Sequence, residues 1–197
     1  MERKTTEKIE KLEGIEEIGR IGKKTVLFDQ RLLVDLPDAF HNMEKQRAEN
    51  RYPSEARPQI LMEDKEHSRF CTFSLIKNQW LAEGQIQCAI QSVCSLVVSL
   101  YPSCLLKEVE VVEKDKGSYG WFAFETMGDK GKVWNIMYVI PVDGCMMLGT
   151  MGCMEYDEDG KEQMIHIMRS LEVQENRQIY AERNVAFYMK NVRDLRS

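Results

Sequence analysis

The sequence predicts an α+β fold in which an antiparallel β-sheet is covered by helices. Short runs rich in β-branched and aromatic residues alternate with turn residues, which is typical of strands joined by tight turns. One long segment, 82–101, instead repeats apolar residues at steps of three and four, which indicates a helix packed on a sheet. Of the 197 residues, 43% are hydrophobic, so we expect one domain with its own core.

The predicted strands form an early hairpin, a second pair and a late meander. Residues 24–28 and 31–36 make the hairpin, and Pro37 ends its second strand. Residues 59–62 and 69–76 make the second pair, across a charged turn. The meander has four runs, 105–112, 119–126, 132–141 and 145–154. The last run is apolar on both faces, so we expect it to be a central, covered strand.

The long helix has one predicted buried stripe. The stripe consists of Ile86, Ala89, Ile90, Val93, Val97 and Leu100. The opposite face carries Cys88, Ser92, Ser95 and Ser99. Pro102 ends the helix, because proline lacks the backbone N–H that a further turn needs.

Shorter helices and two extensions complete the expected chain. Residues 39–49 favour one or two helical turns, and a later helix begins at Asp159, whose pairing with Glu162 resembles a capping box. The apolar positions of that later helix are Met164, Ile165, Met168 and Leu171. The expected organisation is a charged arm or short helix at 1–23, a single domain at 24–173 and an amphipathic helix at 174–197.

Two sets of residues are candidates for binding a partner. The C-terminal helix has a narrow apolar seam formed by Ala181, Val185, Tyr188, Val192 and Leu195, which we expect to pack on its own sheet or on a second protomer. In the run 119–126, alternation puts Phe122 and Phe124 on one face, and Tyr119 and Trp121 on the other. If the phenylalanines fill the core, Tyr119 and Trp121 are covered by another element or form an exposed, partner-binding patch.

Composition limits the classes of partner. The net charge of −5 disfavours nucleic acid, because nucleic-acid binders usually carry a basic surface. The charged N-terminus has no apolar segment typical of a signal peptide, and the run 86–101 is too short and polar to span a membrane, so we expect a cytoplasmic protein. We expect the six cysteines to be reduced core residues, because each lies in an apolar stretch and no export signal is present. None has CxxC spacing, which disfavours a zinc site and thioredoxin-like redox chemistry.

No catalytic, cofactor or metal site is predicted. The three histidines, His41, His67 and His166, accompany no nucleophile motif. The turn at 155–160 mimics the start of a calcium loop, but His166 stands where the bidentate glutamate is needed. We therefore interpret this turn as a solvated helix start, in which acidic side chains favour the helix N-terminus.

Three local features resemble a known fold group. Leu36-Pro37-Asp38-Ala39-Phe40 is similar to the end of its early hairpin, the helix at 82–101 to its central helix, and Ile167-Met168-Arg169-Ser170-Leu171 to its closing helix. Over residues 24–173 the chain thus resembles the PsbP/DcrB-like fold superfamily. The resemblance implies an α-β-α sandwich and a non-enzymatic binding scaffold, and it carries over no functional residue.

The sequence leaves two functions open. The first is a non-catalytic interaction module that binds a protein partner or self-associates, without a cofactor. The alternative is a binder of a small apolar ligand, or a small enzyme, with a pocket between sheet and helix. The methionines of one strand fit both functions, since they could fill the core or line a groove. These methionines are Met146, Met147, Met151 and Met154.

Overall fold

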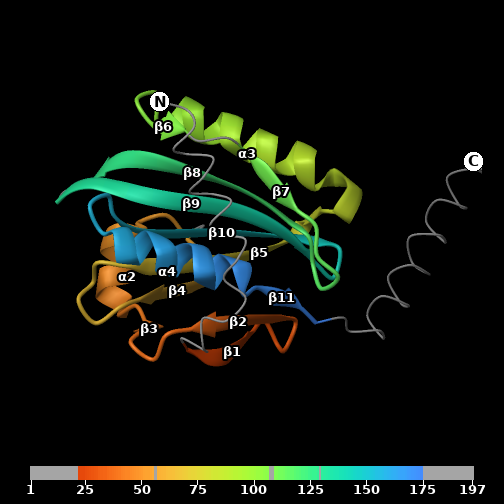
Figure 1. Cartoon of the computed structure of the whole chain (residues 1–197), viewed down its shortest axis with the longest axis horizontal. Helices are drawn as coiled ribbons and strands as arrows, with labels where there is room; N and C mark the ends of the chain where they lie inside the picture. Colours follow the sequence, from red (N-terminus) through yellow and green to blue (C-terminus); the bar gives the residue numbers. More distant parts are fainter. Residues whose placement is uncertain (1–21, 56, 107–108, 129, 175–197) are drawn as a thin grey trace, which may run out of the picture.

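The computed structural model describes residues 22–55, 57–106, 109–128 and 130–174 (Figure 1). Its strands are β1 (Lys23–Leu27), β2 (Leu32–Leu36), β3 (His41–Asn42), β4 (Ile60–Glu63), β5 (Phe70–Trp80), β6 (Leu105–Leu106), β7 (Glu110–Val112), β8 (Tyr119–Gly128), β9 (Gly131–Val142), β10 (Cys145–Met154) and β11 (Glu172–Val173). Its α-helices are α2 (Lys45–Arg51), α3 (Ile86–Leu100) and α4 (Glu158–Arg169), and one 3₁₀ turn, Glu83–Gln85, precedes α3.

The strands form two sheets. The larger, with eight strands, has the order β3-β4-β5-β10-β9-β8-β6, and β7 also pairs with β8. All its pairings are antiparallel, and β8, β9 and β10 follow one another as the predicted meander. The smaller sheet has the order β1-β2-β11.

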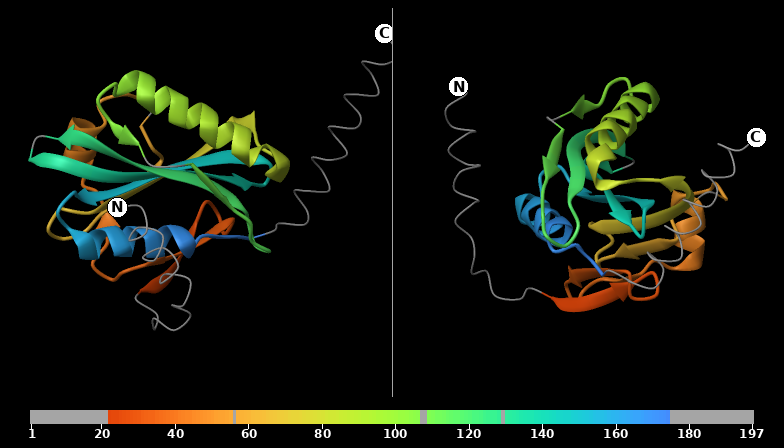
Figure 2. Two further views of the ribbon diagram at one scale, coloured as in Figure 1. Left: turned by 45° about the horizontal axis from the view of Figure 1, so that its top comes forward. Right: turned by 90° about the vertical axis from the view of Figure 1, so that its right-hand side faces the viewer.

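Helices cover both faces of the larger sheet. In Figure 1, α3 lies above the sheet, and α4 lies below it together with the smaller sheet. The two further views in Figure 2 show the same three layers. The α+β architecture with a covered antiparallel sheet is therefore confirmed. None of the described helices is long and apolar enough to cross a membrane.

Strand alternation divides the core between the two faces. Phe122 and Phe124 of β8 pack with Ile86 and Ile90 of α3. Tyr138 of β9 belongs to the larger cluster on the opposite side, which also contains the apolar residues of α4. The expected central position of β10 is confirmed, because it lies between β5 and β9 and is buried along most of its length.

Two glycines allow close packing on this sheet. A Cβ atom on Gly120 would lie 2.9 Å from the Cβ of Ile90, so its absence brings α3 close to β8. A Cβ on Gly149 would lie 2.2 Å from the hydroxyl of Tyr138, which crosses β10 to donate a hydrogen bond to the carbonyl of Thr72 at 3.2 Å. Alanine at either position would force these layers apart.

Several local predictions need correction. The run predicted at 105–112 is two short strands, because β6 and β7 each pair with a different part of β8. The segment 39–49 begins with β3 before it becomes α2. The cap of α4 is Asp157, whose side chain accepts a hydrogen bond from the Gly160 N–H at 2.9 Å, so the predicted cap at Asp159 lies two residues too late.

Candidate interaction surface

Helix α3 lacks charge on all its faces. Its sequence contains no aspartate, glutamate, lysine or arginine, although 30% of the whole chain is charged. The buried side is formed by Ile86, Ile90 and Val97, as predicted. A helix that faces solvent normally carries charged side chains on its outer face. The outer face of α3 therefore has the composition of a surface that is covered.

Exposed apolar side chains gather where α3 ends and β6 begins. We call these residues the α3–β6 surface: Leu96, Val98, Leu100, Tyr101, Leu105 and Leu106. They make up six of the ten exposed large hydrophobic residues in the described part of the chain. Leu100 is 64% exposed and Leu105 is 63% exposed. The prediction that Leu100 continues the buried stripe is wrong, because Val97 is the last buried residue of the helix and Leu100 lies exposed one turn beyond it.

Strand β6 adds an edge to this surface. It is the last strand in the order of the larger sheet, and it pairs with β8 through Leu105↔Glu125 and Leu106↔Phe124. An edge strand presents backbone N–H and C=O groups that an extended partner segment can pair with. Apolar side chains and an edge strand thus meet in one region, which lies at the top of Figure 1.

Two serines of α3 form hydrogen bonds back to their own helix. The Ser92 hydroxyl donates to the carbonyl of Cys88 at 2.8 Å, and the Ser95 hydroxyl donates to the carbonyl of Gln91 at 2.9 Å. Serines that bond back to their own helix offer less to water than free hydroxyls. The helix surface is consequently more apolar than its serine content suggests.

Of the predicted binding residues, the structure describes Tyr119 and Trp121. Tyr119 is fully buried, and burial raises the pKa of its hydroxyl to about 12. Trp121 is partly buried against the same core cluster. Tyr119 and Trp121 are therefore covered by other elements and do not form an exposed patch. The apolar seam of the C-terminal segment, formed by Ala181, Val185, Tyr188, Val192 and Leu195, lies outside the described residues.

The methionines fill the core. Met147, Met151, Met164 and Met168 are completely buried, and Met146 is 6% exposed. They pack between the sheet and the helices on both faces, so they do not line an apolar groove. Of the strand's methionines, Met154 borders an open hollow at the start of α4.

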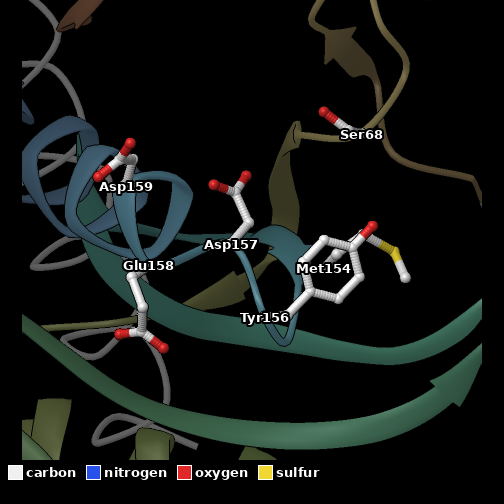
Figure 3. A pocket seen from close by; sticks show the side chains of 6 residues that line it. All are labelled: Ser68, Met154, Tyr156, Asp157, Glu158 and Asp159. Carbon is white, nitrogen blue, oxygen red and sulfur yellow. The ribbon is translucent and has the colours of Figure 1, made fainter.

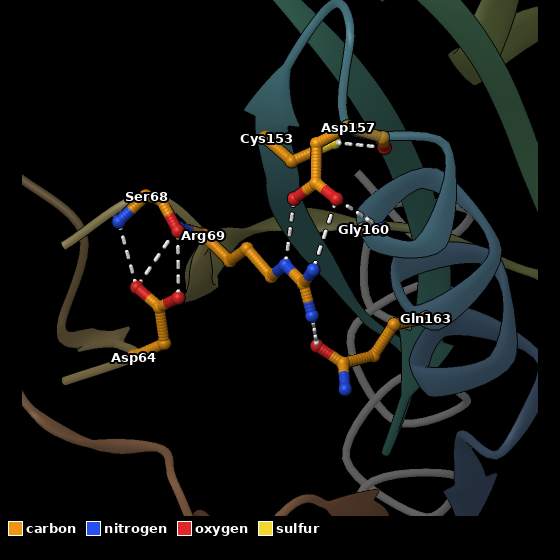
Figure 4. Close-up of polar contacts among 7 residues, drawn as sticks. All are labelled: Asp64, Ser68, Arg69, Cys153, Asp157, Gly160 and Gln163. Carbon is orange, nitrogen blue, oxygen red and sulfur yellow. Dashed lines mark hydrogen bonds and ion pairs between the residues drawn. The ribbon is translucent and has the colours of Figure 1, made fainter. Parts of the chain in front are cut away.

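That hollow is open and acidic. It measures about 440 Å³ and is lined by the residues drawn in Figure 3: Ser68, Met154, Tyr156, Asp157, Glu158 and Asp159. Its central carboxylate is already engaged, because Arg69 donates to Asp157 through Nε at 2.8 Å and through Nη2 at 2.9 Å (Figure 4). The hydrogen bonds from Arg69 hold the pKa of Asp157 below its usual range. We call this pair the Arg69–Asp157 clamp, and it joins β5 to α4.

A second hollow lies between the start of α3 and β7. It measures about 530 Å³, and four of its eight lining residues are charged. The eight are Glu83, Gly84, Ile86, Val111, Glu113, Lys114, Asp115 and Ser118. Burial lowers the pKa of Lys114, which is the only cation among them. Such a polar lining does not match the apolar pocket that the alternative function requires.

Solved structures share this fold. The solution structure of CyanoP, a cyanobacterial PsbP from Synechocystis sp. PCC 6803, matches with a TM-score of 0.56 and 12% identity, over 82% of this chain and 98% of that chain. The crystal structure of the Ran-binding protein Mog1p from Saccharomyces cerevisiae matches with a TM-score of 0.52 and 10% identity, over 79% of this chain and 96% of that chain. No protein-family profile and no curated protein sequence matches. At these identities the likeness is one of fold, and this chain has the α-β-α sandwich of PsbP and Mog1p.

Proposed function

We propose that the protein is a non-catalytic interaction module whose α3–β6 surface binds a protein partner or a second copy of the chain. One observation carries the proposal: a helix without charges exposes apolar side chains beside an edge strand. Contiguous apolar patches on a protein surface usually mark sites of interaction. The two contact modes complement each other, since side chains can fill a groove while the backbone of a partner extends the sheet.

The expected energy is sufficient for specific binding. Full burial of a leucine side chain is worth about 1.5–3 kcal/mol relative to exposure, and this surface exposes Leu96, Leu100 and Leu105 by more than half. Only part of that energy becomes affinity, because association costs translational and side-chain entropy. Even so, a few such residues are enough to act as the dominant contacts of an interface.

Two further observations support this proposal. Mog1p, which shares the fold, is a Ran-binding protein, so a domain of this shape can serve to bind another protein. The acidic hollow offers little for catalysis, because the Asp157 carboxylate is used by Arg69 and by the N-terminus of α4.

The proposed setting is the cytoplasm. All six cysteines lie within the described residues, and no disulfide joins them. The prediction that all six are core residues is wrong, because Cys88 is exposed and Cys94 and Cys104 are only partly buried. Cys71 is completely buried, and burial raises the pKa of its thiol far above the usual range, which keeps it protonated and unreactive. Cysteines that form no disulfide are typical of a reducing compartment.

Site-specific photo-cross-linking in the protein's own cells tests the proposal. A photoreactive phenylalanine at Leu96, Leu100 or Leu105 should give discrete cross-linked products, because a bound partner covers these positions. The matched control is Tyr156, which is 76% exposed but lies beside α4 on the opposite face. Light scattering of the purified full chain then separates self-association from binding to another protein.

The cross-linking pattern decides the outcome. Discrete products at the three leucines and none at Tyr156 support the proposal. Equal products at all four positions, or none at the leucines, would contradict the proposal. A surface that binds no partner should cross-link no more than the exposed control position does.

A further inference from the structure

Three potential metal ligands meet at the opposite edge of the larger sheet. His41 of β3 is the direct cross-strand partner of Glu63 in β4, so their side chains project from the same face. His67 follows in the turn after β4. One ligand atom from each of these residues lies within 4.8 Å of the other two. Two imidazoles and one carboxylate are the ligand set of one common class of zinc site.

The turn that carries His67 is fixed by hydrogen bonds. The backbone N–H of His67 donates a hydrogen bond to the Asp64 carbonyl at 3.1 Å. The Asp64 carboxylate accepts hydrogen bonds from the Ser68 N–H at 2.7 Å and from the Arg69 N–H at 2.9 Å. Figure 4 shows Asp64 turned toward Ser68. His67 itself has φ of 56°, a left-handed conformation, and its Nδ1 lies 3.0 Å from Oε1 of Glu63. The fixed turn thus places the imidazole beside Glu63.

Glu63 gives the second, independent observation. It is completely buried, and its two carboxylate oxygens differ. Oε2 accepts a hydrogen bond from Arg47 Nε at 2.6 Å. Oε1 lies 3.0 Å from His67 Nδ1, yet no described residue donates a hydrogen bond to it. A buried carboxylate oxygen is costly unless a donor or a cation meets it, and in the described part of the chain the only group placed against Oε1 is the His67 imidazole.

A bound cation would remove this cost. We infer that His41, Glu63 and His67 form a binding site for a divalent transition-metal ion such as Zn²⁺. A tetrahedral zinc ion with bonds of about 2.0–2.2 Å holds its ligand atoms roughly 3.3–3.6 Å apart, so ring movements of about an ångström complete the site. Both imidazoles have room to move, because His41 is half-buried and His67 is exposed.

Arg47 completes the arrangement instead of competing with it. It bonds to the oxygen of Glu63 that faces away from His67, and metal-bound carboxylates are commonly held by such outer hydrogen bonds. The exposure of His67 leaves one side open to solvent, where water takes the fourth position. The site is independent of the proposed function, since it lies on β3 and β4 and the α3–β6 surface lies at the other edge.

Zinc titration of the reduced full chain tests this inference. All proteins in the titration carry Cys88→Ser, because the thiol of Cys88 is exposed and could bind zinc itself. We expect one Zn²⁺ per chain by calorimetry. His41→Phe and His67→Asn should each weaken affinity at least tenfold, as loss of a ligand costs no less than loss of an outer partner. Asparagine tolerates the left-handed backbone at position 67, and His166→Gln serves as the matched control.

Spectroscopy separates this site from the cysteines. Co²⁺ bound here should show visible d–d bands without a thiolate-to-cobalt charge-transfer band. Each metal-free variant should melt within a few degrees of the parent, and Zn²⁺ should stabilise the parent and His166→Gln alone. No measurable zinc binding by the parent, unchanged affinity in both histidine variants, or a spectrum dominated by thiolate would each overturn the inference.

Discussion

The two edges of the eight-stranded sheet share a geometry and differ in chemistry. Both end in a strand of two residues, β3 at one edge and β6 at the other. Such short edge strands limit sheet-to-sheet aggregation. Around β6 the exposed side chains are apolar, and α3 beside it is uncharged. Around β3 lie the half-buried His41 and the exposed His67, with an arginine on a buried carboxylate. The backbone thus limits how each edge can pair, and the side chains decide what it can bind.

This difference predicts different responses to conditions. Association through the α3–β6 surface depends on apolar burial, which added salt does not weaken. Binding at the His41–Glu63–His67 site depends on charge and on neutral imidazoles, so it responds to ions and chelators. Variants that change one edge alone test whether the two edges act independently.

The largest effect is expected at the charged edge. Arg47→Met in the presence of a chelator should lower the free energy of unfolding by about 2–3 kcal/mol, because it leaves the second oxygen of buried Glu63 without a donor. Urea denaturation of the full chain measures this loss. The control is Lys45→Met on the same helix. Lys45 is exposed, and its Nζ lies 4.0 Å from Oε1 of Glu49 in a weak surface ion pair. This variant should therefore change the free energy of unfolding by less than about 0.5 kcal/mol. Equal losses in the two variants would show that Glu63 does not depend on Arg47.

Most of this fold could be predicted from sequence, because local patterns specify most of its elements. The alternation in β8 and β9 and the turn residues between them identify the meander, and the three- and four-residue steps identify α3. Strand β11 could not be found in this way. It is two residues long and pairs with β2 across more than 130 residues, as in Glu172↔Leu33. Its position depends on how α4 packs, which no short window of sequence contains.

The candidate sites also combine features that local sequence predicts with features that only the fold creates. The absence of charge in 86–100 can be read directly from the sequence, but the exposure of Leu100 depends on what packs against the last turn of the helix. The spacing of Glu63 and His67 is also local. His41 comes close to them only through the pairing of β3 with β4. The sequence does not predict β3, because it lies in the segment 39–49, which is expected to be helical. Surveys for CxxC spacing do not detect a site assembled in this way.

A smaller effect is expected at the Arg69–Asp157 clamp, which lies on the α4 face. Asp157→Asn should cost about 1 kcal/mol, because asparagine still caps α4 but loses the paired charge. Asp157→Ala should cost about 2 kcal/mol, because it loses the cap as well. Cross-linking from the α3–β6 surface should be unaffected in both variants, and a change there would show that the two faces are coupled.

The clamp also predicts a dependence on pH. Arg69 holds the pKa of Asp157 below its usual range, so the folded state favours the charged carboxylate. The stabilisation is therefore complete above the unfolded pKa of about 3.9, and it is lost as pH falls through the folded pKa. Urea denaturation at pH 7 and at about pH 3 should show a smaller loss on acidification for Asp157→Asn than for the parent. An identical loss would mean that the pair contributes no pH-dependent stability.

The smallest effect separates binding from folding at the apolar edge. Leu100→Ala should change the free energy of unfolding by less than about 0.5 kcal/mol, because this side chain is 64% exposed in the isolated chain. Val97→Ala, one turn earlier and 4% exposed, should cost about 1–3 kcal/mol through the cavity it leaves. If Leu100→Ala instead destabilises the isolated chain as much as Val97→Ala does, the chain itself already covers this surface. If Leu100→Ala reduces cross-linking without reducing stability, the Leu100 side chain contacts the partner, as the uncharged helix predicts.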